Sequence, residues 1–309
     1  MARTLVLVSS VFGLSLLGGC DANGDFGQVT EDFHYAYPLQ SGGQLELSNT
    51  NGSVEITGWD RDSIDVSGTK YASEQAALHD INVKVSASGN RANVSADMPR
   101  TQWHGSRGVR FHVRVPRKIV LERAETTNGS VTVEDLEGGG RIRSTNGKLS
   151  LARLSGDYDV QTTNGSIQID DCSGSDKAET TNGAIRGRIK SGAIQAQSTN
   201  GTLDLAVEKP TDARPIRLST TNGSLTLALT EFHRNPINAE TSHGSVTLRL
   251  PGDTNANLDA ETSMASISSD LSLSSVDERS KHALRGRLGS GGPSISASTS
   301  MGAIRIQRY

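Results

Sequence analysis

Cysteine is nearly absent from this chain, whose 309 residues include only Cys20 and Cys172. A fold held together by disulfides is therefore excluded, because Cys20 is expected to carry lipid, as argued below. Cys172 follows Asn164 by eight residues, at the position where preceding repeats carry Leu136 and Leu154. This equivalence predicts a buried thiol. A reactive or intermolecular cysteine is the alternative.

An excess of charge of one sign is also lacking, since the net charge is −3 and acids and bases are intermixed. No nucleic-acid partner is therefore expected. The seven histidines are dispersed without metal-ligand spacing. Gly147-Lys148 does not complete a phosphate-binding loop, because the glycine required five residues before Gly147 is missing. We expect no cofactor, no metal and no enzymatic activity.

Long apolar runs are missing after the first twenty residues, so no later segment is predicted to cross a membrane. The first residues predict an export signal, with Arg3 followed by the apolar run from Leu5 to Leu17. The order Leu17-Gly18-Gly19-Cys20 resembles the bacterial lipobox. That resemblance implies cleavage after Gly19 and acylation of Cys20, and several acyl chains would make the anchoring stable. An ordinary secretory signal with an incidental cysteine is the alternative.

These expectations define the first two segments as a lipoprotein signal peptide (1–19) and an acylated cysteine with its tether (20–32). We expect the protein to be exported and lipid-anchored to a bacterial envelope membrane, facing the periplasm. Asp21 follows the cysteine, and in enterobacterial lipoproteins that residue favours the inner membrane. The choice between inner and outer membrane stays open.

An Asn-Gly step recurs along the rest of the chain. Four successive intervals are eighteen residues long, and the step continues at Asn222 and in altered form at His243, Met264 and Met301, with Asn51 as an early outlier. Such a period is typical of a solenoid, in which each repeat buries its apolar face against its neighbours. The equally spaced residues are Asn128, Asn146, Asn164, Asn182 and Asn200.

One repeat, from Thr162 to Gly174, shows the expected coil. The Asn-Gly pair tolerates positive φ and marks a corner. The next residues alternate polar and apolar, as in a half-buried strand, and Ser173-Gly174 marks a second corner. Asn-Gly also favours hairpins, but a hairpin here would pair Ser166 to Asp170 with polar Gln161 to Thr163, which offer no apolar face. The sequence predicts an all-β, single-stranded β-solenoid (β-helix) with coils of about 18–22 residues.

Stacking in register predicts columns of equivalent side chains. One inward column is Val131, Leu149, Ile167, Ile185, Leu203, Leu225 and Val246. Two residues further on lie Val133, Leu151, Ile169, Gly187, Leu205, Leu227 and Leu248, and on the opposite wall Ile142, Val160, Ala178 and Ala196. An amide ladder is expected from Asn128, Asn146, Asn164, Asn182, Asn200 and Asn222. A hydroxyl row of Thr126, Ser144, Thr162, Thr180, Ser198 and Thr220 would flank it.

Outward columns carry charges of alternating sign, which suits weak neutralising contacts rather than an active site. These columns are Arg141, Asp159 and Lys177, and Asp135, Arg153 and Asp171.

Aromatic residues make up 4% of the chain, and most of them precede residue 112. We expect residues 33–120 to form an N-terminal aromatic-rich cap with irregular first coils, including a short helix from Ser73 to Asp80 capped by Ser73. A separate recognition module is the alternative. Trp59 and Trp103 are expected to pack within the cap, although stacking on sugars is possible chemically. Regular repeats should follow over 121–309, with a loop insertion at about 270–293 that either binds or is neutral.

The repeated Thr-Thr-Asn-Gly-Ser-Val/Ile phrase resembles a bacterial family of putative adhesins whose domain is of unknown function. Gly58-Trp59-Asp60 after the first copy and Val113 to Pro116 before the regular array extend the resemblance, which covers about Tyr35 to Ile306. It implies a β-solenoid on an exported or anchored protein and provides no catalytic motif.

The leading hypothesis is therefore a non-enzymatic, lipid-anchored envelope protein that presents a rigid surface to an unidentified protein or glycan. A polysaccharide-active β-helix enzyme is one alternative. An ice- or surface-binding solenoid that uses rows such as Thr162 and Asn164 is another.

Overall fold

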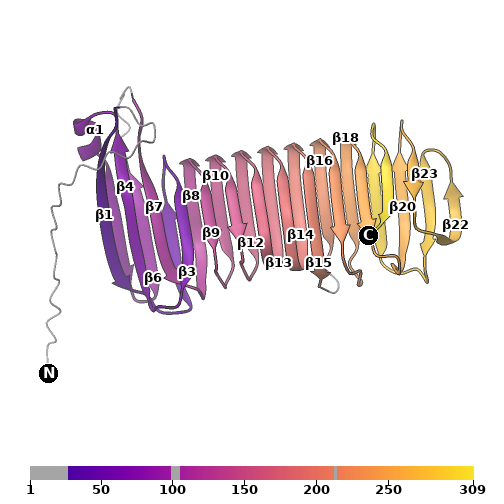
Figure 1. Cartoon of the computed structure of the whole chain (residues 1–309), viewed down its shortest axis with the longest axis horizontal. Coiled ribbons are helices and arrows are strands. Elements are labelled where there is room, and N and C mark those ends of the chain that lie inside the picture. Colours follow the sequence, from indigo (N-terminus) through magenta and orange to yellow (C-terminus); the bar gives the residue numbers. More distant parts are fainter. Residues whose placement is uncertain (1–26, 99–104, 212–213) are drawn as a thin grey trace.

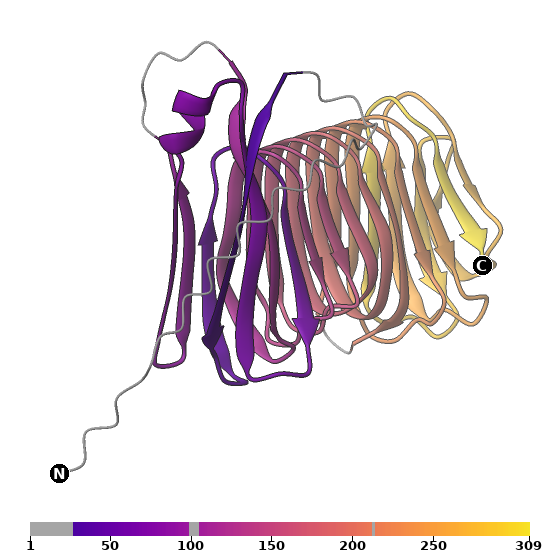
Figure 2. The ribbon, with the colours of Figure 1, turned by 60° about the vertical axis from the view of Figure 1, so that its left-hand side comes forward.

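The computed structural model describes residues 27–98, 105–211 and 214–309. Its strands form two walls that face each other across a narrow core, and the coils stack along one long axis (Figures 1 and 2). From the N-terminal end, the first wall contains β5 (Asn82–Ser88), β6 (Arg91–Asp97), β2 (Gly43–Ser48), β8 (Ile119–Asn128), β10 (Gly140–Asn146), β12 (Tyr158–Asn164), β13 (Ile167–Asn182), β14 (Ile185–Asn200), β16 (Ile216–Asn222), β18 (Ile237–His243), β24 (Ser294–Thr299), β20 (Ala256–Thr262), β23 (Ala283–Leu288) and β22 (Leu273–Arg279).

Strands β13 and β14 turn a corner and belong to both walls. In the same direction, the second wall contains β1 (Val29–Pro38), β4 (Ser63–Ala72), β7 (Arg107–Pro116), β3 (Val54–Trp59), β9 (Val131–Glu134), β11 (Leu149–Ala152), β13, β14, β15 (Leu203–Pro210), β17 (Leu225–Leu229), β19 (Val246–Leu250), β25 (Ile304–Arg308) and β21 (Ile267–Ser269).

Neighbouring coils between residues 119 and 250 pair in parallel, which confirms the predicted β-solenoid. The inward columns are in the predicted register: Ile167 pairs with Leu149 and Ile185, and Val160 pairs with Ile142. Four of these five aliphatic side chains are fully buried, and the fifth, Ile167, is 1% exposed. Burial of a large aliphatic side chain contributes about 1.5–3 kcal/mol, so stacking of apolar columns is the main stabilising interaction between coils.

The Asn-Gly corner needs glycine for a reason other than the predicted one. Gly147 does not adopt a positive φ. Its amide donates to the Asn164 carbonyl at 3.1 Å, and a Cβ on Gly147 would lie 1.8 Å from the Gly129 carbonyl oxygen. Glycine is required because successive corners stack backbone on backbone. Positive φ occurs instead around the second corner, for example at Gly174 (φ 137°) and Arg153 (φ 55°).

At the N-terminal end, spatial order departs from chain order. The coil made by β2 and β3 pairs with β8 and β9, and on its other side with β6 and β7. The chain therefore leaves this coil after Trp59, builds the end of the molecule, and returns at Ile119. The predicted short helix is present as α1 (Gln75–His79), but its N-cap is Glu74 without a side-chain cap bond. Ser73 is not the cap because its amide still extends the β4–β7 ladder by donating to the Ser106 carbonyl.

At the C-terminal end, too, the spatial order of the coils departs from chain order. Strands β24 and β25 lie between the coil of β18 and β19 and the coil of β20 and β21, so the last coil in the sequence is inserted between two earlier ones. The segment 270–293, expected to be a loop, instead contains β22 and β23, which pair antiparallel and extend the first wall past β20. The antiparallel hairpin reverses the direction of the chain along the solenoid axis, so that β24 can return to a place between β18 and β20. Continued parallel coiling would carry the chain further outward.

The structure contains one helix within the described residues, α1, and no described helix is long and apolar enough to span a bilayer.

Candidate functional site

The predicted asparagines form one continuous chain of hydrogen bonds along the corner. Asn146 Nδ2 donates to Asn128 Oδ1 at 2.8 Å, Asn164 donates to Asn146 at 2.8 Å, and the same contact continues through Asn182 and Asn200 to Asn222. The chain also extends backward to a residue that seemed an outlier in sequence: Asn128 donates to Asn51 at 2.8 Å. Asn51 belongs to the ladder because its coil stacks directly on the coil of Asn128, although the two residues are 77 positions apart in the sequence.

The hydroxyl row beside this ladder points inward. Thr162 Oγ1 donates to the Gly147 carbonyl at 3.1 Å and Thr180 Oγ1 to Gly165 at 2.9 Å, and both side chains are buried at 6% exposure. Equivalent bonds are made by Thr126, Ser144, Ser198, Thr220, Thr241, Thr262 and Thr299. These hydroxyls bond the corner carbonyls of adjacent coils, so an ice-binding surface that uses Thr162 lacks one of its two rows.

A second threonine row, one residue further on, faces outward. Its side chains are exposed and form no hydrogen bond with another described residue, so each hydroxyl is available to a ligand. The row consists of Thr127, Thr145, Thr163, Thr181 and Thr199. We did not predict this row, although the sequence contains its signal: the residue before the asparagine is threonine in all these repeats, whereas the buried position before it accepts serine at Ser144 and Ser198. The buried position needs only a hydroxyl, and no hydrogen bond within the described part of the chain explains the constant threonine at the exposed position.

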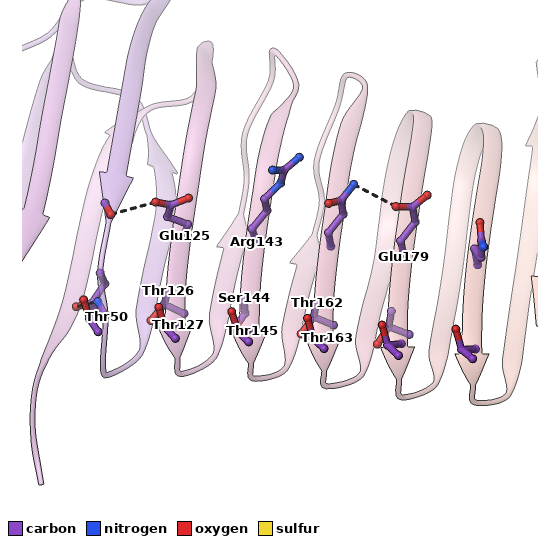
Figure 3. A pocket seen from close by; sticks show the side chains of 17 residues that line it. Thr50, Glu125, Thr126, Thr127, Arg143, Ser144, Thr145, Thr162, Thr163 and Glu179 are labelled. Carbon is purple, nitrogen blue, oxygen red and sulfur yellow. Dashed lines mark hydrogen bonds between the residues drawn. The ribbon is translucent and has the colours of Figure 1, made fainter.

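The exposed threonines line a groove of ≈ 670 Å³ that crosses successive coils of the first wall (Figure 3). Consecutive coils are about 4.8 Å apart, so the groove repeats its hydroxyl groups at that spacing. Its lining is Ser48, Asn49, Thr50, Glu125, Thr126, Thr127, Arg143, Ser144, Thr145, Gln161, Thr162, Thr163, Glu179, Thr180, Thr181, Gln197 and Thr199.

A parallel column of longer side chains forms the other margin of the groove. Ser48 Oγ donates to Glu125 at 3.1 Å, and Gln161 Nε2 donates to Glu179 at 3.1 Å. Arg143 makes one long ion pair with Asp159, at 3.7 Å. Hydroxyl, amide, carboxylate and guanidinium groups thus face one groove, which suits an extended polar ligand more than an apolar one.

The two outward charged columns were expected to form ion pairs between successive members of the same column. Only some of these pairs form. Arg153 binds Asp135 through both carboxylate oxygens, at 2.9 and 3.0 Å, and hydrogen bonding to Arg153 holds the pKa of Asp135 below its usual value. Asp171 instead pairs with Arg188 at 2.8 Å. Lys177 pairs with Glu179 at 2.8 Å rather than with Asp159 in its own column, and that hydrogen bond raises the pKa of Lys177.

The interior contains one unusual polar cluster. Asp176 occupies an inward position between Tyr158 and Ile194 of the adjacent coils, is 3% exposed, and accepts the Tyr158 amide at 3.3 Å through Oδ1. Its Oδ2 and the Tyr158 hydroxyl have no hydrogen-bond partner among the described residues. Burial raises the pKa of Asp176 to about 7.

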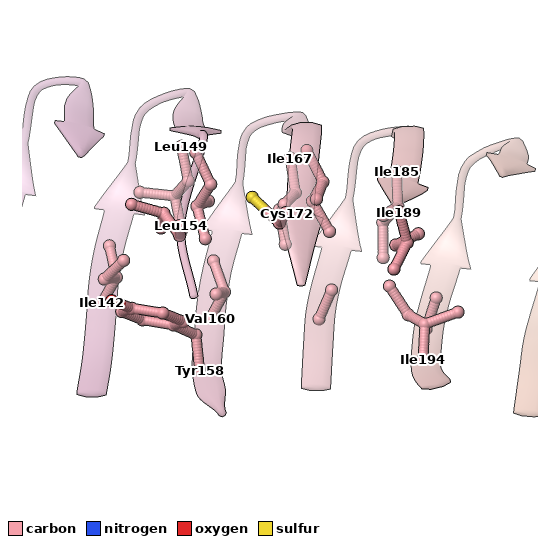
Figure 4. Packing of buried hydrophobic residues seen from close by; sticks show 14 of the residues in the cluster. Ile142, Leu149, Leu154, Tyr158, Val160, Ile167, Cys172, Ile185, Ile189 and Ile194 are labelled. Atoms are coloured by element: carbon pink, nitrogen blue, oxygen red, sulfur yellow. The ribbon is translucent and has the colours of Figure 1, made fainter. Parts of the chain in front are cut away.

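Cys172 lies in the same interior, 1% exposed, among the packed aliphatic side chains of Figure 4. Burial raises the pKa of its thiol to about 12. Because the thiolate is the nucleophilic form, the environment of Cys172 is that of an inert structural thiol.

Trp59 packs in the N-terminal cap. The guanidinium groups of Arg61 and Arg114 lie 5.0 and 4.8 Å from its ring centroid, and its indole N–H donates to the Ser63 carbonyl. These contacts occupy the ring, so stacking on a sugar would require their displacement. Cys20, the cleavage position Gly19 and Trp103 lie outside the described residues. Within those residues, no group of three His, Cys, Asp or Glu side chains is arranged to hold a metal ion.

The chain is thus a single-stranded β-solenoid with a groove lined by polar side chains. A family model described as Toastrack DUF4097 matches residues 35–307, and the chain belongs to this family. No curated protein matches the chain.

The solved structures that are similar to it over 90% of its length include the following three. A putative adhesin from Bacteroides fragilis has 12% identity and a TM-score of 0.43, with 97% of that chain covered. A putative adhesin from Parabacteroides distasonis has 9% identity and a TM-score of 0.40, with 97% covered. A putative cell adhesion protein from Clostridium sporogenes has 12% identity and a TM-score of 0.22, with 100% covered.

Proposed function

We propose that this chain is a non-enzymatic, lipid-anchored protein of the bacterial envelope, and that the threonine-lined groove of the first wall binds an extended protein segment or glycan. The single observation that carries the proposal is the outward threonine row, whose hydroxyls are exposed, bonded to no other described residue and repeated in register over five coils. A ligand that repeats polar groups along its length can contact several such rungs at once. Weak contacts then add together because the surface is rigid and little entropy is lost on binding.

Rigidity follows from the bonding behind the groove. The asparagine ladder and the buried hydroxyl row tie each corner to the next, through bonds such as Asn164 to Asn146 and Thr162 to Gly147. The threonine row therefore keeps its spacing without a ligand. Preorganisation of this kind is typical of binding surfaces.

Non-enzymatic binding is also supported by where the reactive groups lie. The described thiol, Cys172, is buried with a raised pKa, and Asp176 is buried in a different part of the coil from the groove. In the groove itself, Glu125 and Glu179 are hydrogen-bonded to Ser48 and Gln161.

The groove is tested by blocking it. Thr145→Arg combined with Thr163→Arg fills two adjacent rungs, and Ser150→Arg combined with Gln168→Arg places the same side chains on the second wall of the same two coils. Both proteins are measured on one array of envelope glycans and envelope proteins, after melting curves show that they are folded. We expect binding to fall at least about tenfold in the groove variant alone. Equal binding by both variants, or no binding by the unmodified protein, would contradict the proposal.

The anchor is tested separately. We expect the Cys20 peptide from membrane-purified protein to carry acyl chains by mass spectrometry, and Cys20→Ser to move the protein from the membrane to the soluble fraction. An unmodified Cys20 would contradict lipid anchoring without affecting the groove.

A further inference from the structure

The N-terminal end of the second wall finishes on a strand with an open edge. β1 spans ten residues and pairs with β4 alone, without a register shift. The Leu39 amide continues the ladder by donating to the Asp62 carbonyl. This bond shows which alternate residues of β1 direct their amides and carbonyls toward β4. Odd-numbered residues of β1 therefore bond to β4, and the amides and carbonyls of Thr30, Asp32, His34 and Ala36 point away from the sheet.

No described residue bonds to these outward amides. A row of unpaired backbone donors and acceptors is a template for another strand, and proteins usually blunt such edges with bulges or charges. The opposite end of the molecule does so: β22 has seven residues, two register irregularities, and the charged run Asp277-Glu278-Arg279. β1 has neither a bulge nor such a run, and its proline is the last residue, Pro38.

The inward face of β1 is also incompletely covered. Phe33, Tyr35 and Tyr37 are half-buried and pack on the end of the core, with Phe33 5.6 Å from Phe111 between ring centroids. On the first wall, Val85 and Ala87 of β5 are half-buried at the same end. The core thus ends in a partly exposed apolar layer. The strands that carry it, β1 and β5, lie at the N-terminal end of the ribbon (Figure 2).

We propose that β1 is a self-association edge, which pairs antiparallel with β1 of a second copy of this chain. A single foreign strand would satisfy the edge of β1 but leave the apolar layer open. A second copy satisfies both, because a twofold axis normal to the sheet keeps the inner faces on one side and joins the two cores end to end.

The sequence of β1 is compatible with this symmetry. With His34 opposite the His34 of the second copy, the outward-bonding residue Asp32 faces Ala36, and on the inner face Phe33 meets Tyr35. In this register no two acidic and no two basic side chains lie opposite each other apart from the pair of His34 imidazoles. Each His34 bonds Asp65 of its own chain at 2.8 Å. The aromatic rows of the two copies then cover each other.

The register can be tested by cross-linking. Directly opposed residues of an antiparallel pair have Cα atoms about 5.5 Å apart, within the range of a disulfide. In a full chain carrying Cys20→Ser, we expect His34→Cys to form covalent dimers on mild oxidation. Asp32→Cys and Ala36→Cys should not cross-link alone but should do so when mixed. Cys172 is buried and does not compete.

The role of the edge is tested with Ala36→Pro, which removes an outward amide without touching the β1–β4 bonds, and with Ala36→Val as the matched control that keeps the amide. Sedimentation equilibrium should show a dimer for the parent and for Ala36→Val, and at least about tenfold weaker dimerisation for Ala36→Pro, with melting temperatures unchanged. A monomeric parent, a dimer insensitive to Ala36→Pro, or a monomer that pairs only with an added extended peptide would each overturn the proposal.

Discussion

The middle of the solenoid and its two ends stack the same kind of coil in different ways. Between residues 119 and 250, chain order and spatial order agree, and every coil pairs in parallel with the next. At each end the chain runs outward from a coil to the end of the molecule and forms antiparallel strands there. It then returns toward the middle and adds a further coil to the stack. Parallel coiling alone carries the chain in one direction along the axis, so a return into the stack needs antiparallel strands.

The comparison shows where each part derives its stability. The middle depends on identical contacts repeated in register, so a defect in one rung affects both neighbours. The ends depend on individual contacts, such as the Arg285 side chain, which joins Asp259, Glu261 and Glu278 across three strands. We therefore expect changes in the middle to have larger effects than changes at the ends.

The largest effect should come from the buried carboxyl of a middle coil. The pKa of Asp176 rises from 3.8 in the unfolded chain to about 7 in the folded one. The folded state binds the proton more tightly, so stability is greatest below pH 4 as far as this group is concerned and falls as pH rises from about 4 to 7. The loss is roughly 4 kcal/mol over that window.

Asp176→Asn should flatten this pH dependence and make the protein more stable than the parent at pH 8. Denaturant unfolding of both proteins at pH 5 and pH 8 measures the difference. The same slope in both proteins would show that Asp176 is not the responsible group.

The next effect should come from glycine at an Asn-Gly corner. A Cβ on Gly165 would lie 1.9 Å from the Gly147 carbonyl oxygen, so Gly165→Ala must separate stacked backbones and should cost about 3 kcal/mol. Gly89 at the N-terminal end has open space and φ 61°, so Gly89→Ala should cost only about 1 kcal/mol. Chemical denaturation compares the two variants, and equal losses would remove the distinction between stacked corners and end turns.

A smaller effect should come from the amide ladder. Asn164→Ala removes a bond given to Asn146 and a bond received from Asn182, whereas Asn222→Ala removes one. Because these amides are exposed, we expect about 1 kcal/mol for Asn164→Ala and about half of that for Asn222→Ala. Thermal unfolding measures both. A larger loss at Asn222 would mean that the ladder does not act rung by rung.

The smallest effect should come from the surface ion pairs of the C-terminal end. Arg285→Ala should leave the melting temperature almost unchanged but speed hydrogen exchange in β22 and β23, which this side chain links to β20. The difference should disappear in high salt. Faster exchange in the middle coils instead would show that the ends are not independent of the middle.

The repeating middle could be predicted from the sequence because its period fixes register. Once Ile167 and Leu149 are known to be equivalent, the period of eighteen determines the other pairs between Asn128 and Asn200, including that part of the asparagine ladder. The reason for each glycine could not be predicted, because the close approach of Gly147 to Gly129 depends on how neighbouring coils stack. Sequence alone distinguishes poorly between a glycine that needs positive φ and one that needs room.

The ends could not be predicted from the period for a topological reason. Met264 and Met301 continue the pattern in chain order, but the coil of Met301 is stacked before that of Met264. The segment 270–293 has few positions where apolar and polar residues alternate, and it is rich in charged residues. Its sequence therefore resembles that of a loop, although it forms a hairpin. Asn51 looked isolated for the same reason: its partner lies 77 positions away. The outward threonine row was not predicted, because the sequence alone does not show which of the two hydroxyl positions before each asparagine faces outward.

The amides of the ladder all donate in the same direction, from Asn222 back to Asn51. The asparagine Oδ1 of each coil therefore accepts from the asparagine Nδ2 of the next coil. One eighteen-residue repeat can thus replace another in the ladder. Removing residues 147–164 would bring Asn182 onto Asn146 with the same bond and would shorten the threonine-lined groove by one step. Copy number, rather than new side chains, is thus the variable that sets the length of this groove.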